Sequence, residues 1–529
     1  MESEKVFSIA GLKGSVYRPI YIVSGKNCWK VEDSTLKEVN IAEVENGYFI
    51  GTNLKDFVKE LWKLKGILPL SLWDIELVRK YTDPAGKEFQ ESEPLKIISQ
   101  FEKQFLNILS YLSENDYYIK EKTVFAKRKV PAVILMTAVG IQLSALLEYY
   151  GVPLDREEVV KRLAVLEKAK EDFAVDFFAR FGFKPTDKEI REFITSVRLS
   201  SLKKEHILSL WDSFNETERE ILIERWRKKE IERTVALLKK MKDGLKNGRI
   251  YPEWNMEAKT GRMACREPNL MALPKNFSEE LFNVRSVIKP ERGNVFVKID
   301  FPQLELLALS KVIEYFYESI VVEGQVFDFE LEFALKKALE SDVHTEVAKA
   351  FFSEKEIESN RKKCRQFAKT FIFSFLYGAK EKLKYQLSRL LGPDLTDSDV
   401  ETYIRLFYQK FPDIEFYHKT VSGGGEYILP TGTKVIITKK TEALNYPVQN
   451  YASLIVYRFL KEVFAVLKRY MVEGKVKPVL FVHDEVVFEC SEETAEFVKD
   501  ILEKTMTATI YRHTGLVKKE KAQILERYG

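Results

Sequence analysis

Two aspartates far apart in the sequence constrain the fold most. Asp300 ends the apolar run at residues 295–300, and Asp484 stands between two β-rich runs in LFVHDEVVFEC. The residue pattern predicts a strand that ends at Asp300 and a hairpin over residues 479–489 with Asp484 at its tip. Each aspartate taken alone is more often a cap or turn residue. If both belong to one site, the fold must bring distant segments together.

Carboxylates at two strand ends form the arrangement that phosphoryl transfer needs. Two divalent ions about 3.5–4 Å apart can activate an attacking hydroxyl and stabilise a leaving group. Hard oxygen ligands favour magnesium or manganese over zinc. Asp300 and Asp484 could therefore share two Mg²⁺ ions, with Mn²⁺ as the alternative.

The segment between the two aspartates carries a cluster of positive charge. Five cations and no acid occur within nine residues, namely Arg361, Lys362, Lys363, Arg365 and Lys369. If the segment is helical, Arg365, Lys369, Phe373 and Tyr377 fall at successive i, i+4 positions. Such a stripe is about 18 Å long, basic at one end and aromatic at the other, which suits a triphosphate and a stacked base. An amphipathic helix that buries its aromatics accounts for Phe371 and Phe375 but not for the cations.

Four sequence blocks resemble, in the right order, the motifs of family A DNA polymerases of the bacterial DNA polymerase I type. TGRMACREPNLMALP at residues 260–274 resembles TGRLSSxxPNLQNIP, and DFPQLELLALS at 300–310 resembles motif A, DYSQIELRxxA. RQFAKTFIFSFLYG at 365–378 resembles motif B, RRxAKxxNFGxxYG, and VHDE at 482–485 resembles motif C. The resemblance extends from about residue 100 to the end of the chain.

The resemblance implies roles for the residues that match these motifs. Asp300 and Asp484 would bind the metal ions, with Glu485 as a supporting acid and Lys369 as a catalytic cation. The incoming nucleotide would be contacted by Gln303, Glu305, His344, Arg365, Lys369, Phe373 and Tyr377. Within this set, Glu305 would be the steric gate against a ribose 2′-hydroxyl, and Tyr377 would cap the templating position.

The same resemblance implies contacts with a primer-template, largely from the minor groove, where shape is read rather than sequence. These residues are Arg262, Asn269, Arg285, Asn445, Gln449 and His483. Without the ordered blocks, each would be read as a polar surface or turn residue. The chain departs from the motifs at Met271, Leu307, Ile372 and Ser374, and in ACR at 264–266. These departures avoid the metal ligands, so they bear on fidelity and rate more than on activity.

The implied fold class is multidomain α+β, a right-hand polymerase with palm, fingers and thumb. The polymerase domain would cover residues 101–529, with the thumb at about 155–250, the fingers at about 321–425 and the palm in the remainder. Residues 1–100 alternate β-rich runs at 21–23 and 48–50 with a helical stretch at 54–65, an α/β pattern.

This N-terminal domain faintly resembles a 3′–5′ exonuclease domain through GTNLKDF at 51–57 and LWDIELVRKY at 72–81. The acidic ligands do not align, because no DxE occurs around 21–24 and Phe57, preceded by Asp56, stands where a carboxylate is expected. Asp74 and Glu76 read as an ordinary helix start. We therefore expect a degenerate exonuclease fold without proofreading, and nothing in the chain resembles a 5′-nuclease domain.

Charge and cysteine usage restrict the kinds of partner, metal site and cell compartment that the chain can have. The 84 basic and 80 acidic residues give a net charge of +4, so affinity for nucleic acid must come from local clusters such as residues 221–249. A charge run by itself is more often a solvated helix face. Four scattered cysteines argue against disulfides and zinc, and no secretion signal is seen. The apolar segment at 130–147, interrupted by Thr137, Gln142 and Ser144, predicts a buried helix rather than a membrane span.

The expected function is DNA-templated extension of a primer with dNTPs by a monomer in the cytoplasm, or in the host cytoplasm if the chain is viral. One alternative is an RNA-templated or ribonucleotide-incorporating enzyme, although Glu305 and Phe373 favour deoxynucleotides. A second alternative is a non-catalytic DNA-binding accessory with a polymerase fold. The presence of Asp300, Lys369 and Asp484 argues against this second alternative.

Overall fold

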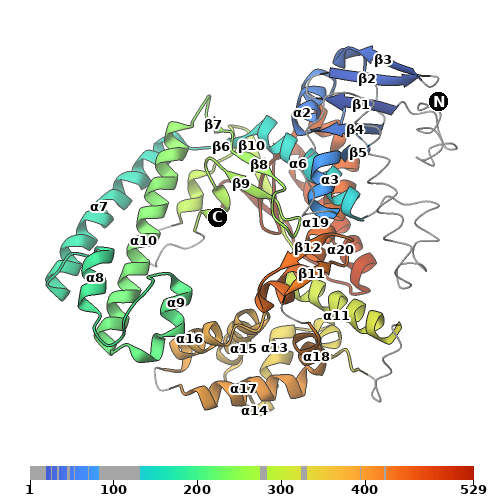
Figure 1. The fold of residues 1–529 in the computed structure, drawn as a ribbon. Coiled ribbons are helices and arrows are strands. Elements are labelled where there is room, and N and C mark those ends of the chain that lie inside the picture. The colour runs from blue at the N-terminus through green and yellow to red at the C-terminus, as the bar shows by residue number, and fades with distance from the viewer. Residues whose placement is uncertain are drawn as a thin grey trace.

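The fold is arranged around a central antiparallel sheet, with a separate N-terminal sheet, a two-helix arm and a helical lobe (Figure 1). The computed structural model describes residues 20–82, apart from 25–26, 33–34, 45–47, 53 and 70, together with residue 100. It also describes residues 132–529, apart from 275–282, 323–330, 393–394 and 422–423. The expected domain boundary near residue 100 therefore falls at the edge of a stretch outside the described residues.

The N-terminal sheet has five strands in the order β3-β2-β1-β4-β5. Its strands are β1 Ile20–Ser24, β2 Asn27–Glu32, β3 Thr35–Val39, β4 Tyr48–Thr52 and β5 Ser71–Asp74. The pairs β1–β4 and β4–β5 are parallel and the other two pairs are antiparallel. Helices α2 Leu54–Lys65 and α3 Ile75–Thr82 and the short η1 Ile41–Glu43 complete this part. The predicted strands at 21–23 and 48–50 and the predicted helix at 54–65 are confirmed.

Helix α6, Ala132–Tyr150, links the N-terminal sheet to the central sheet. It contacts α2 and β5 on one side and β13 and α19 on the other. The polar residues that interrupt its apolar run are buried, with Thr137, Gln142 and Ser144 only 0%, 7% and 2% exposed. Gln142 donates to the carbonyl of Pro69, and Ser144 Oγ donates to Ile141 O at 3.0 Å. The predicted buried helix is therefore confirmed, and no helix in the described part of the chain is long and apolar enough to cross a membrane.

The two-helix arm consists of α7 Arg156–Phe181 and α10 Glu216–Asp243, with α8 Asp187–Phe193, α9 Lys204–Ser209 and η2 Trp211–Ser213 at its far end. Asp155 caps the start of α7, and Asn215 forms a capping box with Glu218 at the start of α10. A small core of the arm's own, including Phe177, Ile190, Ile207, Ile221 and Leu222, holds its far end together.

Two arginines of the basic run at residues 221–249 do not belong to the exposed helix face that such a run favours. Arg225 is 7% exposed and binds Asp187 with two hydrogen bonds of 2.9 and 3.1 Å. Arg249 lies beyond the end of α10, in β7 Arg249–Ile250, where it binds the fully buried Glu489 at 2.6 Å. These two arginines are therefore engaged inside the protein rather than exposed to a ligand, because a buried charge must be paired.

The helical lobe follows the central strand β10. It contains α11 Leu304–Val322, α12 Ala334–Leu339, α13 Val343–Ala348, α14 Glu354–Ser359, α15 Arg361–Phe375, α16 Lys380–Leu391, α17 Asp397–Lys410 and α18 Pro412–Thr420. Aromatic rings fill its interior, with Phe351 and Phe371 4.7 Å apart and Phe371 and Phe407 5.1 Å apart. A hairpin of β11 Gly425–Ile428 and β12 Lys434–Ile437 leads back to the central sheet.

The central sheet has the strand order β13-β14-β10-β15 and is antiparallel throughout. Its strands are β10 Asn294–Asp300, β13 Val476–Val482, β14 Glu485–Ser491 and β15 Gln523–Leu525. Helices α19 Lys440–Val472 and α20 Glu492–Thr514 pack beside it. Short elements complete the fold: β6 Val152–Pro153, β8 Glu253–Asn255, β9 Ala264–Arg266, η3 Leu270–Ala272 and η4 Val284–Val287. The predicted strand ending at Asp300 and the predicted hairpin around Asp484 are both confirmed.

Candidate active site

Asp300 and Asp484 lie at the same end of two paired strands. The register of β10 with β14 sets Asp300 directly opposite Glu485. Asp484 and His483 form the two-residue turn between β13 and β14, and His483 takes a left-handed φ of 60°. Phe301 N donates to Asp484 O at 3.4 Å. The two aspartates therefore come from neighbouring segments, as the sequence pattern required.

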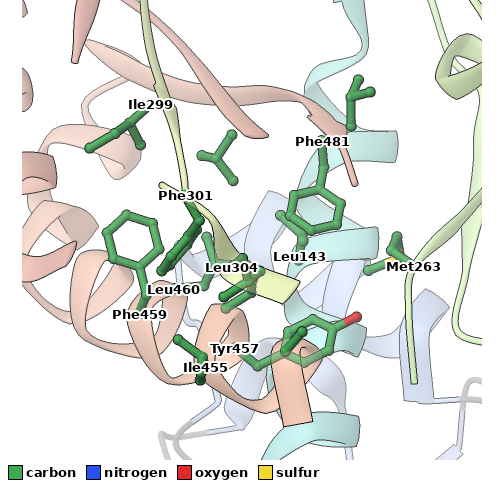
Figure 2. Close-up of a cluster of buried hydrophobic side chains, with 14 of the residues drawn as sticks. Leu143, Met263, Ile299, Phe301, Leu304, Ile455, Tyr457, Phe459, Leu460 and Phe481 are labelled. Atoms are coloured by element: carbon green, nitrogen blue, oxygen red, sulfur yellow. The ribbon is translucent and has the colours of Figure 1, made fainter. Parts of the chain in front are cut away.

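A buried apolar cluster supports this strand end (Figure 2). The residues on either side of Asp300, Ile299 and Phe301, are 1% and 4% exposed and belong to the cluster. The ring of Phe301 packs edge-to-face against that of Phe459 in α19, with the two ring centroids 5.3 Å apart. Phe481, from strand β13 on the far side of β14, is also buried there. Because flanking side chains are anchored in the core, the exposed Asp300 has a fixed backbone.

The electrostatics of the two aspartates suit a bound cation. Burial, and next the negative charge of Asp300, raise the pKa of Asp484 to about 7. Carboxylates that oppose each other's ionisation are relieved by a divalent cation, which oxygen ligands of this kind bind well. The two carboxylates therefore offer oxygen ligands of the kind that hold a hard divalent cation. Within the described ranges, no group of three or more His, Cys, Asp or Glu residues is arranged to hold a metal ion, so the candidate site consists of two aspartates.

Glu485 faces the same side of the sheet but is already bound by two other groups. Tyr528 donates its hydroxyl proton to Glu485 Oε1 at 2.5 Å, and Lys298 Nζ lies 3.0 Å from Oε2. Glu485 is buried, with 7% of the residue exposed. Both carboxylate oxygens are thus occupied, which supports an indirect role beside Asp484.

Glu305 and Arg262 form an ion pair beside the aspartates. The Arg262 Nη2 to Glu305 Oε1 distance is 2.7 Å, with both side chains partly exposed. Burial, together with the charge of Glu305, raises the pKa of Tyr377 far above its ordinary value. Tyr377 follows the end of α15 at Phe375, so it is not on the helical stripe that the sequence predicted. It nevertheless lies beside Glu305 rather than away from the site.

The remaining stripe residues form an exposed basic and aromatic face on α15. Arg365, Lys369 and Phe373 are all exposed, and Phe373 is 37% exposed. Asp342 accepts from Arg365 Nε at 2.8 Å and from Nη2 at 3.3 Å. Although burial opposes it, hydrogen bonding to Arg365 lowers the pKa of Asp342 to about 2. Arg365 is therefore held in one orientation while its helix face stays accessible.

His344 lies between this face and the interior of the lobe. It is 5% exposed, and its ring centroid is 5.9 Å from that of Phe373. Burial, and next the positive charge of Arg365, lower its pKa to about 4, so the imidazole is neutral near pH 7. Its Nδ1 has no protein partner within the described residues. The ring can thus act as a hydrogen-bonding group without adding charge.

The residues predicted to contact a primer-template have diverse surroundings. Arg285 donates through Nε to Leu273 O at 3.1 Å and through Nη1 to Tyr528 Oη at 3.0 Å. Asn269 accepts from Met271 N at 3.1 Å, so its side chain caps the short helix η3. His483 is exposed in the turn between β13 and β14. Partial burial, and next the positive charges of Arg262 and Arg285, lower the pKa of its imidazole.

Helix α19 carries the last two predicted contacts, Asn445 and Gln449, which are half-buried. The helix is tied to the loop before Arg262, because Asn450 Nδ2 donates to Thr260 O at 3.3 Å and Tyr457 Oη donates to Gly261 O at 3.0 Å. Gln303 precedes α11 with a left-handed φ of 55°, and its Oε1 has no partner among the described residues.

Sequence reasoning missed three residues of the site, Lys298, Asp342 and Tyr528. Lys298 could have been found, because it stands two residues before Asp300 and so faces the same side of the strand. Asp342 directly precedes α13, where an acid reads as an ordinary cap. Tyr528 gives no signal, since only the tertiary fold brings the chain end to Glu485.

Comparison with known proteins identifies the family. The model of "DNA polymerase family A" matches residues 168–426 and 430–517. DNA polymerase I of Aquifex aeolicus is 28% identical over 377 residues, which cover 68% of this chain and 61% of that protein. DNA polymerase I of Caldicellulosiruptor bescii is 23% identical over 570 residues, which cover 98% of this chain and 63% of that protein. The chain thus spans about three fifths of the length of these two relatives.

The overall fold matches a solved polymerase domain. The structure described as the POL domain of Pol1 from M. smegmatis in complex with DNA primer-template and dNTP superposes with a TM-score of 0.68. The match covers 99% of this chain and 97% of that chain at 15% sequence identity, so it establishes the fold. With the family match over two long segments, the conclusion is that the chain belongs to DNA polymerase family A.

Proposed function

We propose that the chain is a DNA-templated DNA polymerase that extends a primer 3′ end with dNTPs by phosphoryl transfer with two metal ions. The observation that carries this proposal is the pair Asp300 and Asp484 at one strand end, where burial, and next the negative charge of Asp300, raise the pKa of Asp484 to about 7. The two relatives described above, both named DNA polymerase I, and the primer-template and dNTP in the M. smegmatis complex support the substrates.

The proposed mechanism assigns positioning and charge compensation to this chain's side chains. Asp300 and Asp484 would hold Mg²⁺ or Mn²⁺, which supplies positive charge to the attacking hydroxyl and to the leaving pyrophosphate. Arg365 and Lys369, exposed on α15, would bind the triphosphate, since cations there stabilise charge that develops on its oxygens. Glu485, already bound by Lys298 and Tyr528, would support Asp484 without binding substrate.

The same reading assigns the nucleotide pocket and the domains. Phe373 would pack on the nucleotide, with His344 behind it, and Glu305 would exclude a 2′-hydroxyl while Tyr377 caps the templating position. The central sheet would be the palm, the two-helix arm the thumb at about residues 155–250, and the helical lobe the fingers at about 321–425. A primer-template would lie against Arg262, Asn269, Arg285, Asn445, Gln449 and His483.

We further propose that the N-terminal domain has no nuclease activity. Asp74, 6% exposed, accepts from Leu54 N at 2.8 Å and from Leu77 N at 3.1 Å, so it holds the starts of α2 and α3. Glu76 is bound by Arg79 at 2.6 Å. Asp56 points to solvent with its side chain 78% exposed. These three acids therefore serve the fold or the surface and do not converge as metal ligands.

The metal assignment is tested by changing each aspartate to its uncharged isostere. Asp300→Asn and Asp484→Asn should each lower primer extension by at least about 10³-fold, the scale on which charge-stabilising groups act in phosphoryl transfer. Binding of primer-template, measured by fluorescence anisotropy, should change little. Asp500→Asn, on the exposed face of α20, is the matched control and should extend normally.

Template choice is tested in the same assay with a DNA template and an RNA template in separate reactions. If the chain extends primers on the RNA template but not on the DNA template, it is an RNA-templated polymerase and the DNA-templated assignment is wrong. Full extension by either aspartate variant would refute the proposed metal site, and binding without extension by the wild-type chain would favour the non-catalytic accessory.

The gate assignment predicts a change in sugar selection. Glu305→Ala should raise incorporation of ribonucleotides relative to deoxynucleotides by about 10- to 100-fold, because the side chain no longer excludes the 2′-hydroxyl. The ratio of kcat/KM for rNTP and dNTP measures this. Arg262→Ala, which breaks the same ion pair but keeps the Glu305 side chain, is the comparison. An equal change in both variants would attribute selection to the ion pair rather than to the gate.

The absence of proofreading predicts that a mismatched primer end persists. A primer with a mismatched, labelled 3′ nucleotide should keep its label when incubated with the wild-type chain and Mg²⁺ without dNTPs. Gel electrophoresis over a time course, beside a matched primer that the same preparation extends, gives the measurement. Release of the terminal nucleotide within the time of one extension would contradict the proposal.

A further inference from the structure

The C-terminal segment is built into the central sheet beside the proposed catalytic aspartates. Strand β15 pairs with β10, with Leu525 opposite Phe296 and Gln523 opposite Lys298. Beyond it, Arg527 Nη2 binds Asp155 Oδ2 at 2.7 Å. Tyr528 N donates to Ile288 O at 3.0 Å, and the residue is 1% exposed. The penultimate residue is therefore a fixed part of the interior.

Tyr528 joins three charged side chains through one hydroxyl and one ring. The hydroxyl donates to Glu485 Oε1 at 2.5 Å and accepts from Arg285 Nη1 at 3.0 Å. The Arg285 guanidinium lies 5.4 Å from the ring centroid, and Lys298 Nζ lies 6.0 Å from it. Lys298 also binds the other oxygen of Glu485 at 3.0 Å. The network is closed, so each member restricts the others.

We propose that Tyr528 is a positioning residue of the active site, an inference that rests on the proposed polymerase function. Glu485 adjoins Asp484 in the chain and opposes Asp300 in the sheet, so fixing Glu485 fixes the turn that carries Asp484. Fixing Arg285 in the same network orients a proposed primer-template contact. The chain end thereby couples the position of the metal-binding turn to that of the nucleic acid.

The test removes only the hydroxyl, with Tyr528→Phe in the full chain. Loss of the bonds to Glu485 and Arg285 should lower the maximal rate of single-nucleotide incorporation by about 10- to 100-fold, the effect of a small displacement of reacting groups. The KM for dNTP should change much less. Tyr511→Phe on the exposed face of α20 is the control, since Tyr511 is 56% exposed.

Two further measurements separate positioning from mere stability. The melting temperature of Tyr528→Phe should stay near the wild-type value, and its primer-template Kd should change much less than its incorporation rate. In a double-mutant cycle, the defects of Tyr528→Phe and Glu485→Leu should be less than additive, because each substitution removes the hydrogen bond that the two side chains share. A wild-type incorporation rate, or fully additive defects, would overturn the inference. Failure of the wild-type chain to extend any primer would instead refute the proposed function.

A second, independent observation concerns the far end of the two-helix arm, which touches the helical lobe (Figure 1). Tyr385 of α16 is 5% exposed and packs edge-on against two tryptophans of the arm. Its ring centroid is 5.1 Å from that of Trp211 and 5.8 Å from that of Trp226. The two tryptophans stack at 5.7 Å. The arm and the lobe are thus joined by aromatic packing, not by chance proximity of surface residues.

Charged groups reinforce this contact. Lys384 of the lobe pairs with Asp212 of the arm, and also lies 3.1 Å from Asp397 of its own lobe. Lys204 of the arm lies 4.8 Å from the Trp226 ring centroid and 5.8 Å from that of Tyr385. Aromatic pairs and cation–π contacts at such distances stabilise interfaces between rigid parts. The arm, the central sheet and the lobe consequently form a closed ring.

We infer that this contact is a latch that closes the proposed thumb and fingers around the nucleic acid. This inference also rests on the proposed function. A closed protein ring can take up a nucleic-acid strand in two ways. Either the ring opens, or a free end of the nucleic acid threads through it. The latch would therefore slow dissociation after loading without taking part in phosphoryl transfer.

The latch is tested by locking it covalently. The four native cysteines are buried, so Asp212→Cys with Lys384→Cys offers the accessible thiol pair for a short bismaleimide. The cross-link should form in the free protein. The locked protein should extend a primer on a short linear template, onto which it can thread. It should extend poorly on a primed circular single strand, which has no end.

The reciprocal experiment adds the cross-linker after the protein has bound the nucleic acid. Protein locked after binding the primed circle should stay bound through a high-salt wash, whereas either single-cysteine variant, treated alike, should wash off. Absence of the cross-link in the free protein, or equal extension of circles and linear templates by the locked protein, would overturn the latch. Extension by the unlocked double variant tests the proposed function separately.

Discussion

The pairing of β10 with β14 is the constraint on which the rest of the site depends. Its register sets Asp300 opposite Glu485 and leaves Asp484 in the adjoining turn. A slip of one residue would send Asp300 to the opposite face of the sheet, among the core side chains that now hold Ile299 and Phe301. The same strand also pairs with β15 on its other edge, so one strand fixes both aspartates and the chain end.

The charges around this strand end are arranged in pairs. Glu305 is bound by Arg262, Glu485 by Lys298, and Asp342 by Arg365, each at 3.0 Å or less. Asp484 differs, because burial and Asp300 raise its pKa. Fixed side-chain pairs restrict the movement of the groups beside the site, whereas the two aspartates retain an unfavourable repulsion that a cation relieves. This contrast is what the proposed phosphoryl-transfer site would require for preorganisation.

Much of the secondary structure follows from the sequence pattern, because strand alternation and helix capping are local. The helix at 54–65 and the strand ending at Asp300 agree with the structure to within one residue. Burial and pairing are not local. The basic run at 221–249 therefore looked like one exposed face, while Arg225 and Arg249 are buried against Asp187 and Glu489. The prediction that Tyr377 continues the stripe on α15 was likewise wrong, because the helix ends at Phe375.

The sequence by itself determined the family resemblance, the order of the four motif blocks, and Asp300 and Asp484 as the central pair, since residue types at fixed spacing carry that information. Tertiary structure alone decided which partners hold the site. Tyr528 reaches Glu485 and Arg285 only because β15 pairs with β10, and Tyr385 meets Trp211 only because the arm folds back onto the lobe. Contacts of this kind depend on packing between segments distant in sequence, and no local pattern encodes them.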